Sequence, residues 1–339
     1  MDITESLPQL LQQKNLSADE MQQVMTQIMT GKATDAQIGG FLVALRLKGE
    51  TVDEISGAAR VMRELATPVH VDCDFLVDTC GTGGDGANTF NISTAVSFVT
   101  AAAGAHVAKH GNRSITSSCG SADVLEAAGA NLNIGPEQVG RAITEVGVGF
   151  MFAVKHHGAM KHAIGPRKEL GIRTIFNVLG PLTNPAGAPN QVIGVFDKQL
   201  VPSIASVLQS LGSRHVLVVH SADGMDEISI AAETHVAELQ DGQISEYLIK
   251  PEDFDLTRSS LDPLRVNNVE EAVAMLKTAI SGKGQGASDI VALNAGAAIY
   301  ASGIASSLKE GVVLAEDAMG SGAASAKFEE FISFTQHCL

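Results

Sequence analysis

The chain has 339 residues, of which 45% are apolar and 18% are charged, a balance typical of a soluble globular protein and not of a disordered one. Its formal net charge of −15 argues against general nucleic-acid binding, because an acidic protein repels a phosphate backbone. No run of roughly 18 apolar residues predicts a membrane span, and an acidic first segment without an apolar stretch predicts a cytosolic location.

The first part of the chain is predicted to form a helical domain over residues 1–70. Three segments fit the capping box, in which the first side chain bonds the fourth residue's N–H and the fourth side chain bonds back; they are Ser17–Glu20, Thr34–Gln37 and Thr51–Glu54. Gly31 and Gly49 follow where two of these helices are expected to end. Helices from about residues 160–185 are expected to join this domain.

Residues 71–339 are predicted to form a larger α/β domain. Four short apolar runs are expected to be buried strands: Phe75–Asp78, His106–Lys109, Gln191–Phe196 and His215–Val219. Helix-length segments lie between them, near residues 93–103, 121–128, 198–211 and 269–281. This alternation favours a mainly parallel sheet flanked by helices on both faces. Asp241-Gly242, between two apolar stretches, predicts one hairpin.

A glycine-rich segment, Asp78–Asp85, follows the first predicted strand, and Asn91–Thr94 opens the next predicted helix. Glycines let backbone N–H groups approach an anion, and the helix dipole favours negative charge at this end. Hydroxyl groups of Thr89, Ser93 and Thr94 can add donors or bind a metal. The glycine spacing fits neither the dinucleotide fingerprint nor the Walker motif. The alternative interpretation is a tight turn before an ordinary helix cap.

A second anion-binding segment is predicted at Lys109–Ser117, directly after a strand. It combines cations, a glycine and hydroxyl groups within nine residues, as a phosphate or pyrophosphate requires. Basic residues are also concentrated between His106 and Arg173, which fits either an anion pocket or a solvated helix face. Asp123, at the start of the next predicted helix, is expected to cap that helix or to pair with Arg113.

A third segment, Asp223–Glu227, follows the strand at 215–219 and is strongly acidic. Adjacent carboxylates beyond the carboxyl end of a strand suit magnesium, which takes one or two carboxylates together with substrate phosphates. The alternative is a solvated acidic turn. The two phosphate-type loops that precede it in the sheet favour the metal site.

Taken together, these motifs resemble the anthranilate phosphoribosyltransferases. The segments that carry the resemblance are Asp78–Asp85, Asn91–Thr94, Lys109–Arg113, Gly120–Asp123, Met160–His162, Arg167–Gly171, Arg173–Pro185 and Asp226-Glu227. The resemblance implies a nucleoside phosphorylase-like fold and a homodimer. It implies binding of phosphoribosyl pyrophosphate (PRPP) with two Mg²⁺ ions per subunit, and transfer of the phosphoribosyl group to anthranilate in tryptophan biosynthesis.

The resemblance also implies a role for individual residues. Those expected to contact PRPP are Gly81, Gly84, Asp85, Thr89, Asn91, Ile92, Ser93, Thr94, Lys109, His110, Gly111, Asn112, Arg113, Ser114, Ile115, Thr116, Ser117 and Ser121. Those expected to hold anthranilate are Gly81, Asn112 and Arg167, and those expected to bind Mg²⁺ are Ser93, Asp226 and Glu227. Lys109 and Arg113 are expected to be catalytic, because they can stabilise charge on the departing pyrophosphate.

No general base is assigned. The aromatic amine of anthranilate is neutral at pH 7, so positioning is expected to dominate. Four histidines are interpreted as packing or substrate-shaping residues: His110, His156, His157 and His162.

Two alternatives remain at this point. A pyrimidine nucleoside phosphorylase shares the expected fold, but Asn91–Thr94 and Arg173–Pro185 favour the transferase. A non-enzymatic nucleic-acid-binding relative would need a basic surface, which the net charge opposes.

Overall fold

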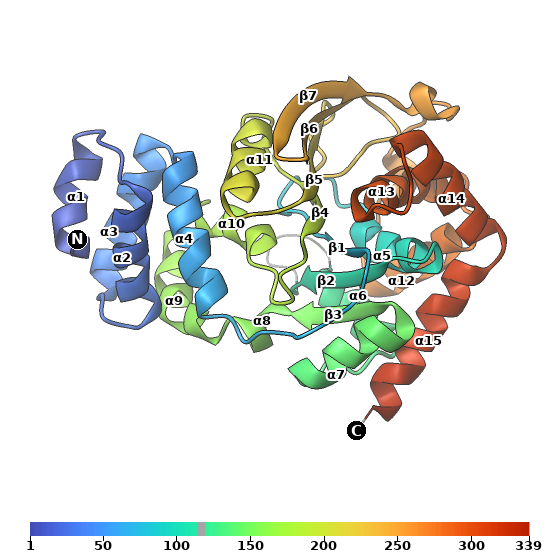
Figure 1. Cartoon of the computed structure of the whole chain (residues 1–339), viewed down its shortest axis with the longest axis horizontal. Helices are drawn as coiled ribbons and strands as arrows, with labels where there is room; N and C mark the ends of the chain where they lie inside the picture. Colours follow the sequence, from blue (N-terminus) through green and yellow to red (C-terminus); the bar gives the residue numbers. More distant parts are fainter. Residues whose placement is uncertain (114–118, 339) are drawn as a thin grey trace.

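The computed structural model of the chain describes residues 1–113 and 119–338. It begins with a lobe of four helices, drawn in blue in Figure 1: α1 (Ile3–Leu11), α2 (Ala18–Met29), α3 (Asp35–Lys48) and α4 (Val52–Glu64). All three predicted capping boxes are present, at Ser17, Thr34 and Thr51. Gly31 and Gly49 follow α2 and α3 with φ of 74° and 88°, so the backbone leaves each helix where a side chain would be strained.

Helix α9 (Lys161–Leu170) packs against α2 and α3, although more than a hundred residues separate them in the chain. The nearby α8 (Ala153–His156) and α10 (Phe176–Leu179) belong to the same connecting region. Apolar residues of α2, α3, α4, α9 and α10 share one buried cluster. The boundary between two domains near residue 70 stays a prediction.

The centre of the larger body is a seven-stranded sheet in the order β3-β2-β1-β4-β5-β6-β7. Its strands are β1 (Leu76–Thr79), β2 (His106–Gly111), β3 (Val148–Phe152), β4 (Asn190–Gly194), β5 (His215–Ser221), β6 (Thr234–Gln240) and β7 (Gln243–Ile249). The first five in sequence pair in parallel, and β5, β6 and β7 pair antiparallel. The four predicted strands are confirmed, and β3 was not predicted. The predicted hairpin joins β6 and β7, with positive φ at both Asp241 and Gly242.

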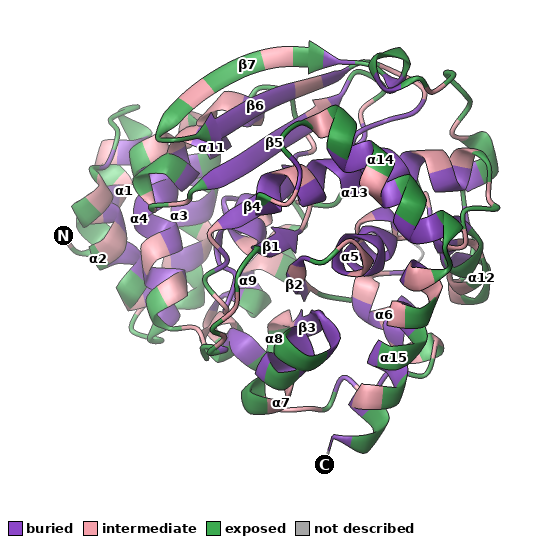
Figure 2. Cartoon of the chain, turned by 45° about the vertical axis from the view of Figure 1, so that its right-hand side comes forward, coloured by how far each residue is buried: buried purple, intermediate pink, exposed green. Residues whose placement is uncertain are grey.

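Helices cover both faces of this sheet, as Figure 2 shows. One face carries α5 (Ile92–Ala102), α12 (Val269–Ile280), α13 (Gly286–Ser302), α14 (Leu308–Gly320) and α15 (Ala323–His337), whose apolar residues form one large cluster. The other face carries α11 (Leu200–Ser210), on which α4 of the lobe packs. Side chains alternate between the two clusters, with Val192 in one and Ile193 in the other. Both faces being buried explains why these strands are continuous apolar runs.

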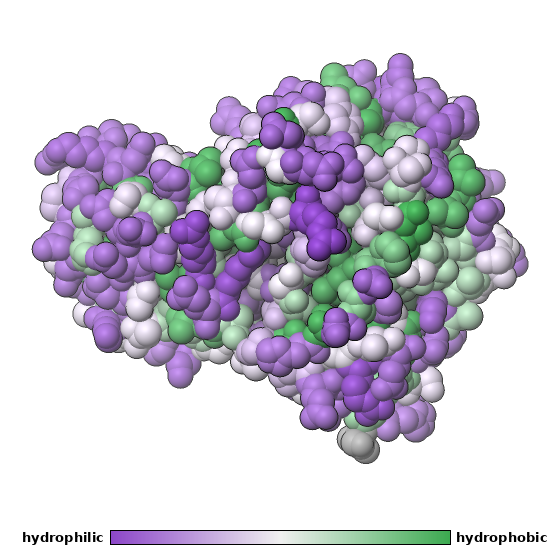
Figure 3. Space-filling view, in the orientation of Figure 1, coloured by the Kyte–Doolittle hydropathy of each residue, from purple (hydrophilic) through white to green (hydrophobic). Residues whose placement is uncertain are grey.

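Two shorter helices, α6 (Ser121–Ala127) and α7 (Pro136–Arg141), complete the connections around β2 and β3. No helix in the described part of the chain is long and apolar enough to cross a bilayer. The space-filling view shows the helical lobe projecting from the larger body, and the surface is indented where the two meet (Figure 3).

The strand order locates the natural ligand crevice. From β1 the chain builds outward through β2 and β3, then returns to place β4 on the other side of β1. In parallel sheets a ligand binds at such a switch point, beyond the carboxyl ends of the strands. The segments following β1 and β4 are therefore expected to border a ligand site.

Candidate functional site

The glycine loop, residues 81–86, follows β1 and is held against the end of β4. The Thr82 N–H donates to the Gly194 carbonyl at 2.9 Å, and the Phe196 N–H donates to the Thr82 hydroxyl at 3.0 Å. Gly83 and Gly84 have φ of 66° and 78°, so the loop needs glycine at both positions. The Gly83 N–H donates to Asp226 Oδ2 at 2.6 Å, which joins this loop to the acidic segment after β5.

Asp226 is buried between two glycines. A Cβ on Gly81 would lie 2.5 Å from Asp226 Oδ2, and a Cβ on Gly194 would overlap the Asp226 carbonyl oxygen. The following backbone is held by α13, because Asn294 accepts from the Ile228 N–H at 2.9 Å. The solvated acidic turn considered above is therefore wrong for Asp226, although Asp223 is exposed.

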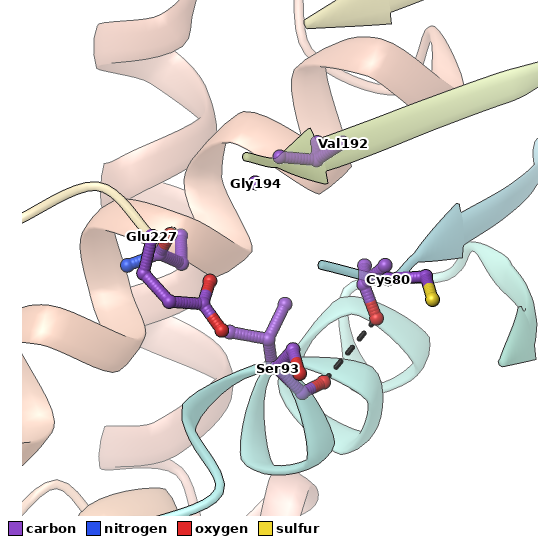
Figure 4. A pocket seen from close by; sticks show the side chains of 8 residues that line it. Cys80, Ser93, Val192, Gly194 and Glu227 are labelled. Atoms are coloured by element: carbon purple, nitrogen blue, oxygen red, sulfur yellow. Dashed lines mark hydrogen bonds between the residues drawn. The ribbon is translucent and has the colours of Figure 1, made fainter. Parts of the chain in front are cut away.

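The carboxyl groups of Asp226 and Glu227 are crowded with a third one. Burial raises the pKa of both; repulsion from Asp85 raises the pKa of Asp226 further, and repulsion from Asp226 and Asp85 raises that of Glu227. Figure 4 shows the Glu227 side chain directed toward Ser93 at the start of α5, in a small pocket also lined by Cys80 and Gly194. A cation placed here would relieve the repulsion.

The available ligand atoms fit magnesium, which is bound partly by water and substrate, better than a metal ion bound entirely by protein side chains. Among residues 1–113 and 119–338, no group of three or more His, Cys, Asp or Glu side chains is arranged to hold a metal ion. Two carboxylates and one hydroxyl, those of Asp226, Glu227 and Ser93, leave positions for water and substrate phosphate, as magnesium prefers.

Lys109 lies near these carboxylates. Its side chain is almost fully buried, and its ammonium donates to the Thr79 carbonyl. Its positive charge lowers the pKa of Glu227 and of Asp78, opposing the effect of burial on each. Lys109 is therefore a buried cation held at the end of β1, just before the glycine loop.

His110 and His157 form a buried pair, with 3.2 Å between their Nε2 atoms. His110 Nδ1 lies 3.1 Å from the Gly180 carbonyl, so Nδ1 is the protonated nitrogen and His157 must donate to His110 Nε2. Burial lowers the pKa of His110 to about 3 and that of His157 to about 4. Both rings are therefore neutral at physiological pH.

Arg113 is engaged in ion pairs. Its guanidinium lies 2.8 Å from Asp123 Oδ1 and 2.6 Å from Glu126 Oε2, which confirms the expected pairing with Asp123. Gly111 and Ser121 are also close, since a Cβ on Gly111 would overlap the Ser121 hydroxyl. The predicted residues Ser114, Ile115, Thr116 and Ser117 lie outside the described residues.

The remaining predicted PRPP residues border the glycine loop and α5. Thr89 forms an isolated bridge with Arg265, and Asn91 donates to the Cys119 carbonyl at 3.2 Å. Ile92 is buried, and the buried Thr94 hydroxyl has no hydrogen-bond partner among the described residues. Ile92 thus lies in the core.

Arg167 lies on α9, apart from the two anion loops. Its guanidinium is 4.9 Å from the centre of the Phe176 ring and forms no ion pair with a described residue. Burial lowers its pKa. A half-buried arginine that stacks on an aromatic ring and has no acidic partner is suited to a planar carboxylate. No hydrogen bond joins it to Gly81 or Asn112 within the described part of the chain.

Sequence reasoning missed three contributors. Gly194 makes room for Asp226. Arg173 donates to the Gly84 carbonyl, and its guanidinium lies 4.1 Å from the Phe196 ring centre. Asp78 accepts a hydrogen bond from the backbone N–H of His110. Asp78 and Arg173 stood inside recognised motifs, whereas Gly194 carried no signal.

Comparisons with known proteins agree with this geometry. Residues 4–66 match the family model described as a glycosyl transferase family helical bundle domain, and residues 74–325 match that of the family's a/b domain. A Cellvibrio japonicus protein named anthranilate phosphoribosyltransferase is 62% identical over 341 residues, covering 99% of each chain. One from Hahella chejuensis is 63% identical over 339 residues, covering 99% of this chain and 98% of its own.

Solved structures give the same result. The crystal structure of anthranilate phosphoribosyltransferase from Thermus thermophilus matches with a TM-score of 0.93 at 43% identity, covering 99% of this chain and 100% of that one. The Saccharomyces cerevisiae enzyme in complex with PRPP and Mg matches with a TM-score of 0.89 at 27% identity, covering 98% of each chain. The expected fold class and family resemblance are confirmed, and the chain belongs to the anthranilate phosphoribosyltransferase family.

Proposed function

We propose that this protein transfers the phosphoribosyl group of PRPP to the amine of anthranilate. The products are N-(5-phosphoribosyl)anthranilate and pyrophosphate, in tryptophan biosynthesis. The observation that carries the proposal is the pair of adjacent carboxylates at the switch point of the sheet: the buried Asp226, which is packed against the glycine loop, and the half-buried Glu227. Solved relatives from Saccharomyces cerevisiae in complex with PRPP and Mg, and with 4-fluoroanthranilate, support the choice of substrates.

Mg²⁺ would be held by Asp226, Glu227 and the Ser93 hydroxyl, with two ions per subunit. When bound, the metal supplies positive charge to the pyrophosphate group. The protein's own contribution to the leaving group comes from the buried Lys109 ammonium and the N–H groups of the glycine loop. Arg113 can join them by sharing its guanidinium between Glu126, Asp123 and the substrate.

Anthranilate would be positioned chiefly by Arg167, through a charge-assisted contact with its carboxylate. Asn112 and Gly81 would complete this part of the site. The neutral His110–His157 pair fits packing or substrate shaping. The amine needs no strong base before attack, so the chain's main task is to hold the amine in line with the anomeric carbon.

The remaining expectations belong to the same proposal. The protein works as a homodimer in the cytosol, with PRPP and anthranilate as its small-molecule substrates and no nucleic-acid or membrane partner. The acidic net charge of −15 supports the absence of nucleic-acid binding.

The decisive experiment follows the loss of anthranilate fluorescence on adding the protein and PRPP, with and without Mg²⁺. A decay that needs both protein and metal, with an equal amount of pyrophosphate released, is the expected result. If folded protein gives no decay, the proposed reaction is wrong, and release of base from a pyrimidine nucleoside with phosphate is the next assay.

A further inference from the structure

Asp78 on β1 has no role in the function proposed above, yet its environment is unusual. It lies three residues before the glycine loop and is fully buried. Its Oδ1 accepts a hydrogen bond of 3.2 Å from the His110 N–H, whereas its Oδ2 has no hydrogen-bond partner among the described residues. The amide of the nearby Asn184 donates to the Ala108 carbonyl at 2.8 Å, and its proximity also lowers the pKa of Asp78. A buried carboxylate oxygen without a partner destabilises a fold, and such groups are retained mainly where they serve function.

The carboxylate of Asp78 replaces a backbone hydrogen bond between β1 and β2. Pairing between β1 and β2 is recorded at Leu76 with His106 and at Val77 with Val107, whereas β2 continues beside β3 as far as Gly111. Beyond Val107, the His110 N–H is bonded by the Asp78 side chain instead of a β1 carbonyl. Asp78 therefore fixes the backbone at the start of the second anion loop.

The second contact of Asp78 is electrostatic. The positive charge of Lys109 lowers the pKa of Asp78, which burial raises to about 6. The Lys109 ammonium donates to the carbonyl of Thr79, the residue next to Asp78. The same ammonium is also attracted by Glu227, whose pKa it lowers. The Lys109 ammonium is therefore held at Thr79, where the charges of both Asp78 and Glu227 act on it.

We propose that Asp78 is a positioning residue that keeps the Lys109 ammonium on the β1 side of the site. Without the Asp78 charge, the ammonium would move toward Asp226 and Glu227, where it would compete with a divalent cation and leave the pyrophosphate. This inference rests on the proposed function for the identity of the anion. The buried, half-satisfied carboxylate is retained because it balances the attraction of the acidic pair for Lys109.

Asp78→Asn tests this idea, because the amide oxygen can still accept from the His110 N–H while the charge is lost. The Mg²⁺ concentration for half-maximal rate and the KM for PRPP should each rise about tenfold, the effect of losing one modest charge interaction. The KM for anthranilate should stay within about twofold. The melting temperature should be unchanged or higher, because a buried charge has been removed.

The matched control is Glu238→Gln, which removes a second buried carboxyl group of the same sheet. Glu238 bonds His215 and Tyr247, each at 2.8 Å, away from the predicted site residues. This variant should melt at a lower temperature with unchanged kinetic constants. Asp78→Glu keeps the charge, so its Mg²⁺ dependence and its KM for PRPP should be closer to those of the wild type than the values for Asp78→Asn. If Asp78→Asn does not fold, Asp78→Glu is the variant to measure.

Calorimetric titration of metal-free protein with Mg²⁺ and inorganic pyrophosphate gives a readout that does not depend on turnover. Weaker binding to Asp78→Asn supports the inference, and unchanged binding with an unchanged KM for PRPP would overturn it. Equal loss of kinetics and melting temperature in Asp78→Asn and Asp78→Glu would also overturn it, because that pattern indicates a structural role. A wild-type protein that binds pyrophosphate but consumes no anthranilate would reject the proposed function without rejecting this inference.

Discussion

A Cβ atom on Gly194 would overlap the backbone carbonyl oxygen of Asp226. The last residue of β4 and the first residue of the acidic pair approach this closely because Gly194 has no side chain. Gly194 also accepts the hydrogen bond from Thr82 in the glycine loop. Gly194, which has no functional side chain, thus sets the spacing between the glycine loop and Asp226, an expected magnesium ligand.

Gly194→Ala should therefore displace Asp226 and impair the metal site. The added methyl group meets backbone atoms, which cannot move aside as a flexible side chain would. We expect kcat to fall about 100-fold or more, as when one transition-state contact is lost. Gly39→Ala is the matched control, because nothing lies within 4 Å of its Cβ position, and it should stabilise helix α3 by about 0.5–1 kcal/mol. Equal activity of the two variants would contradict the role given to Gly194.

The acidic pair can be tested without measuring turnover. The double variant Asp226→Ala with Glu227→Ala should lose magnesium-dependent activity and remain folded, because the repulsion that raises their pKa values disappears with them. A ligand that binds the native state stabilises it, by about 2.7 kcal/mol at a hundred times its Kd. Mg²⁺ with pyrophosphate should therefore raise the melting temperature of the wild type and not of the double variant. The same rise in both would remove the metal assignment.

Arg167 is predicted to recognise the carboxylate of anthranilate. Arg167→Ala should raise the KM for anthranilate about 10–100-fold, since a hydrogen bond to a charged group contributes about 1.5–3 kcal/mol, with little change in the KM for PRPP. The neighbouring Lys168 is exposed, so Lys168→Ala controls for loss of a positive charge on α9. Equal effects of Arg167→Ala on both substrates would leave no case for a specific carboxylate contact.

Within the helical lobe, Lys48 and Glu54 form a buried ion pair with 2.9 Å between the ammonium and the carboxylate. Glu54 also accepts from the N–H groups of Leu16 and Thr51. Lys48→Met leaves a buried carboxylate without its cation, which should destabilise the lobe by about 3–5 kcal/mol. Arg141→Ala breaks an exposed pair with Glu145 and should change stability by less than about 1 kcal/mol. Chemical denaturation followed by circular dichroism distinguishes the two.

Local signals in the sequence were sufficient for much of the fold. The capping boxes at Ser17, Thr34 and Thr51 each act within four residues, and the Asp241-Gly242 turn needs only its own two backbone conformations. Strand β3 escaped prediction. It is a five-residue run that periodicity cannot separate from the helical turns before it.

The details of the site depend on contacts between distant segments. Gly194 meets Asp226 across two neighbouring strands, and Arg173 reaches Gly84 from 89 residues away. Neither relationship leaves a periodic or compositional trace, because each arises only when the strand order brings β1, β4 and β5 together. The family motifs identified the residues that face substrate, whereas the residues that support them emerged from packing.

The neutral histidine pair predicts how stability depends on pH. The folded-state pKa of His157 is about 4, below the ordinary value of 6.5, so the unfolded chain takes up a proton as the pH falls below 6.5 while the native state does not. Stability should therefore fall progressively between pH 6.5 and about 4, by about 3 kcal/mol for His157 alone. Asp78 has the opposite effect on stability below pH 6. Its pKa is raised to about 6, so its carboxyl group takes up a proton in the native state at a pH where the unfolded chain is still ionised, and this stabilises the native state. His157→Gln keeps a donor for His110 and cannot titrate in this range, so its unfolding free energy should fall less steeply than that of the wild type. Urea unfolding at pH 7.5, 6, 5 and 4 measures the difference, and parallel pH profiles for the two proteins would show that His157 is not held neutral by burial.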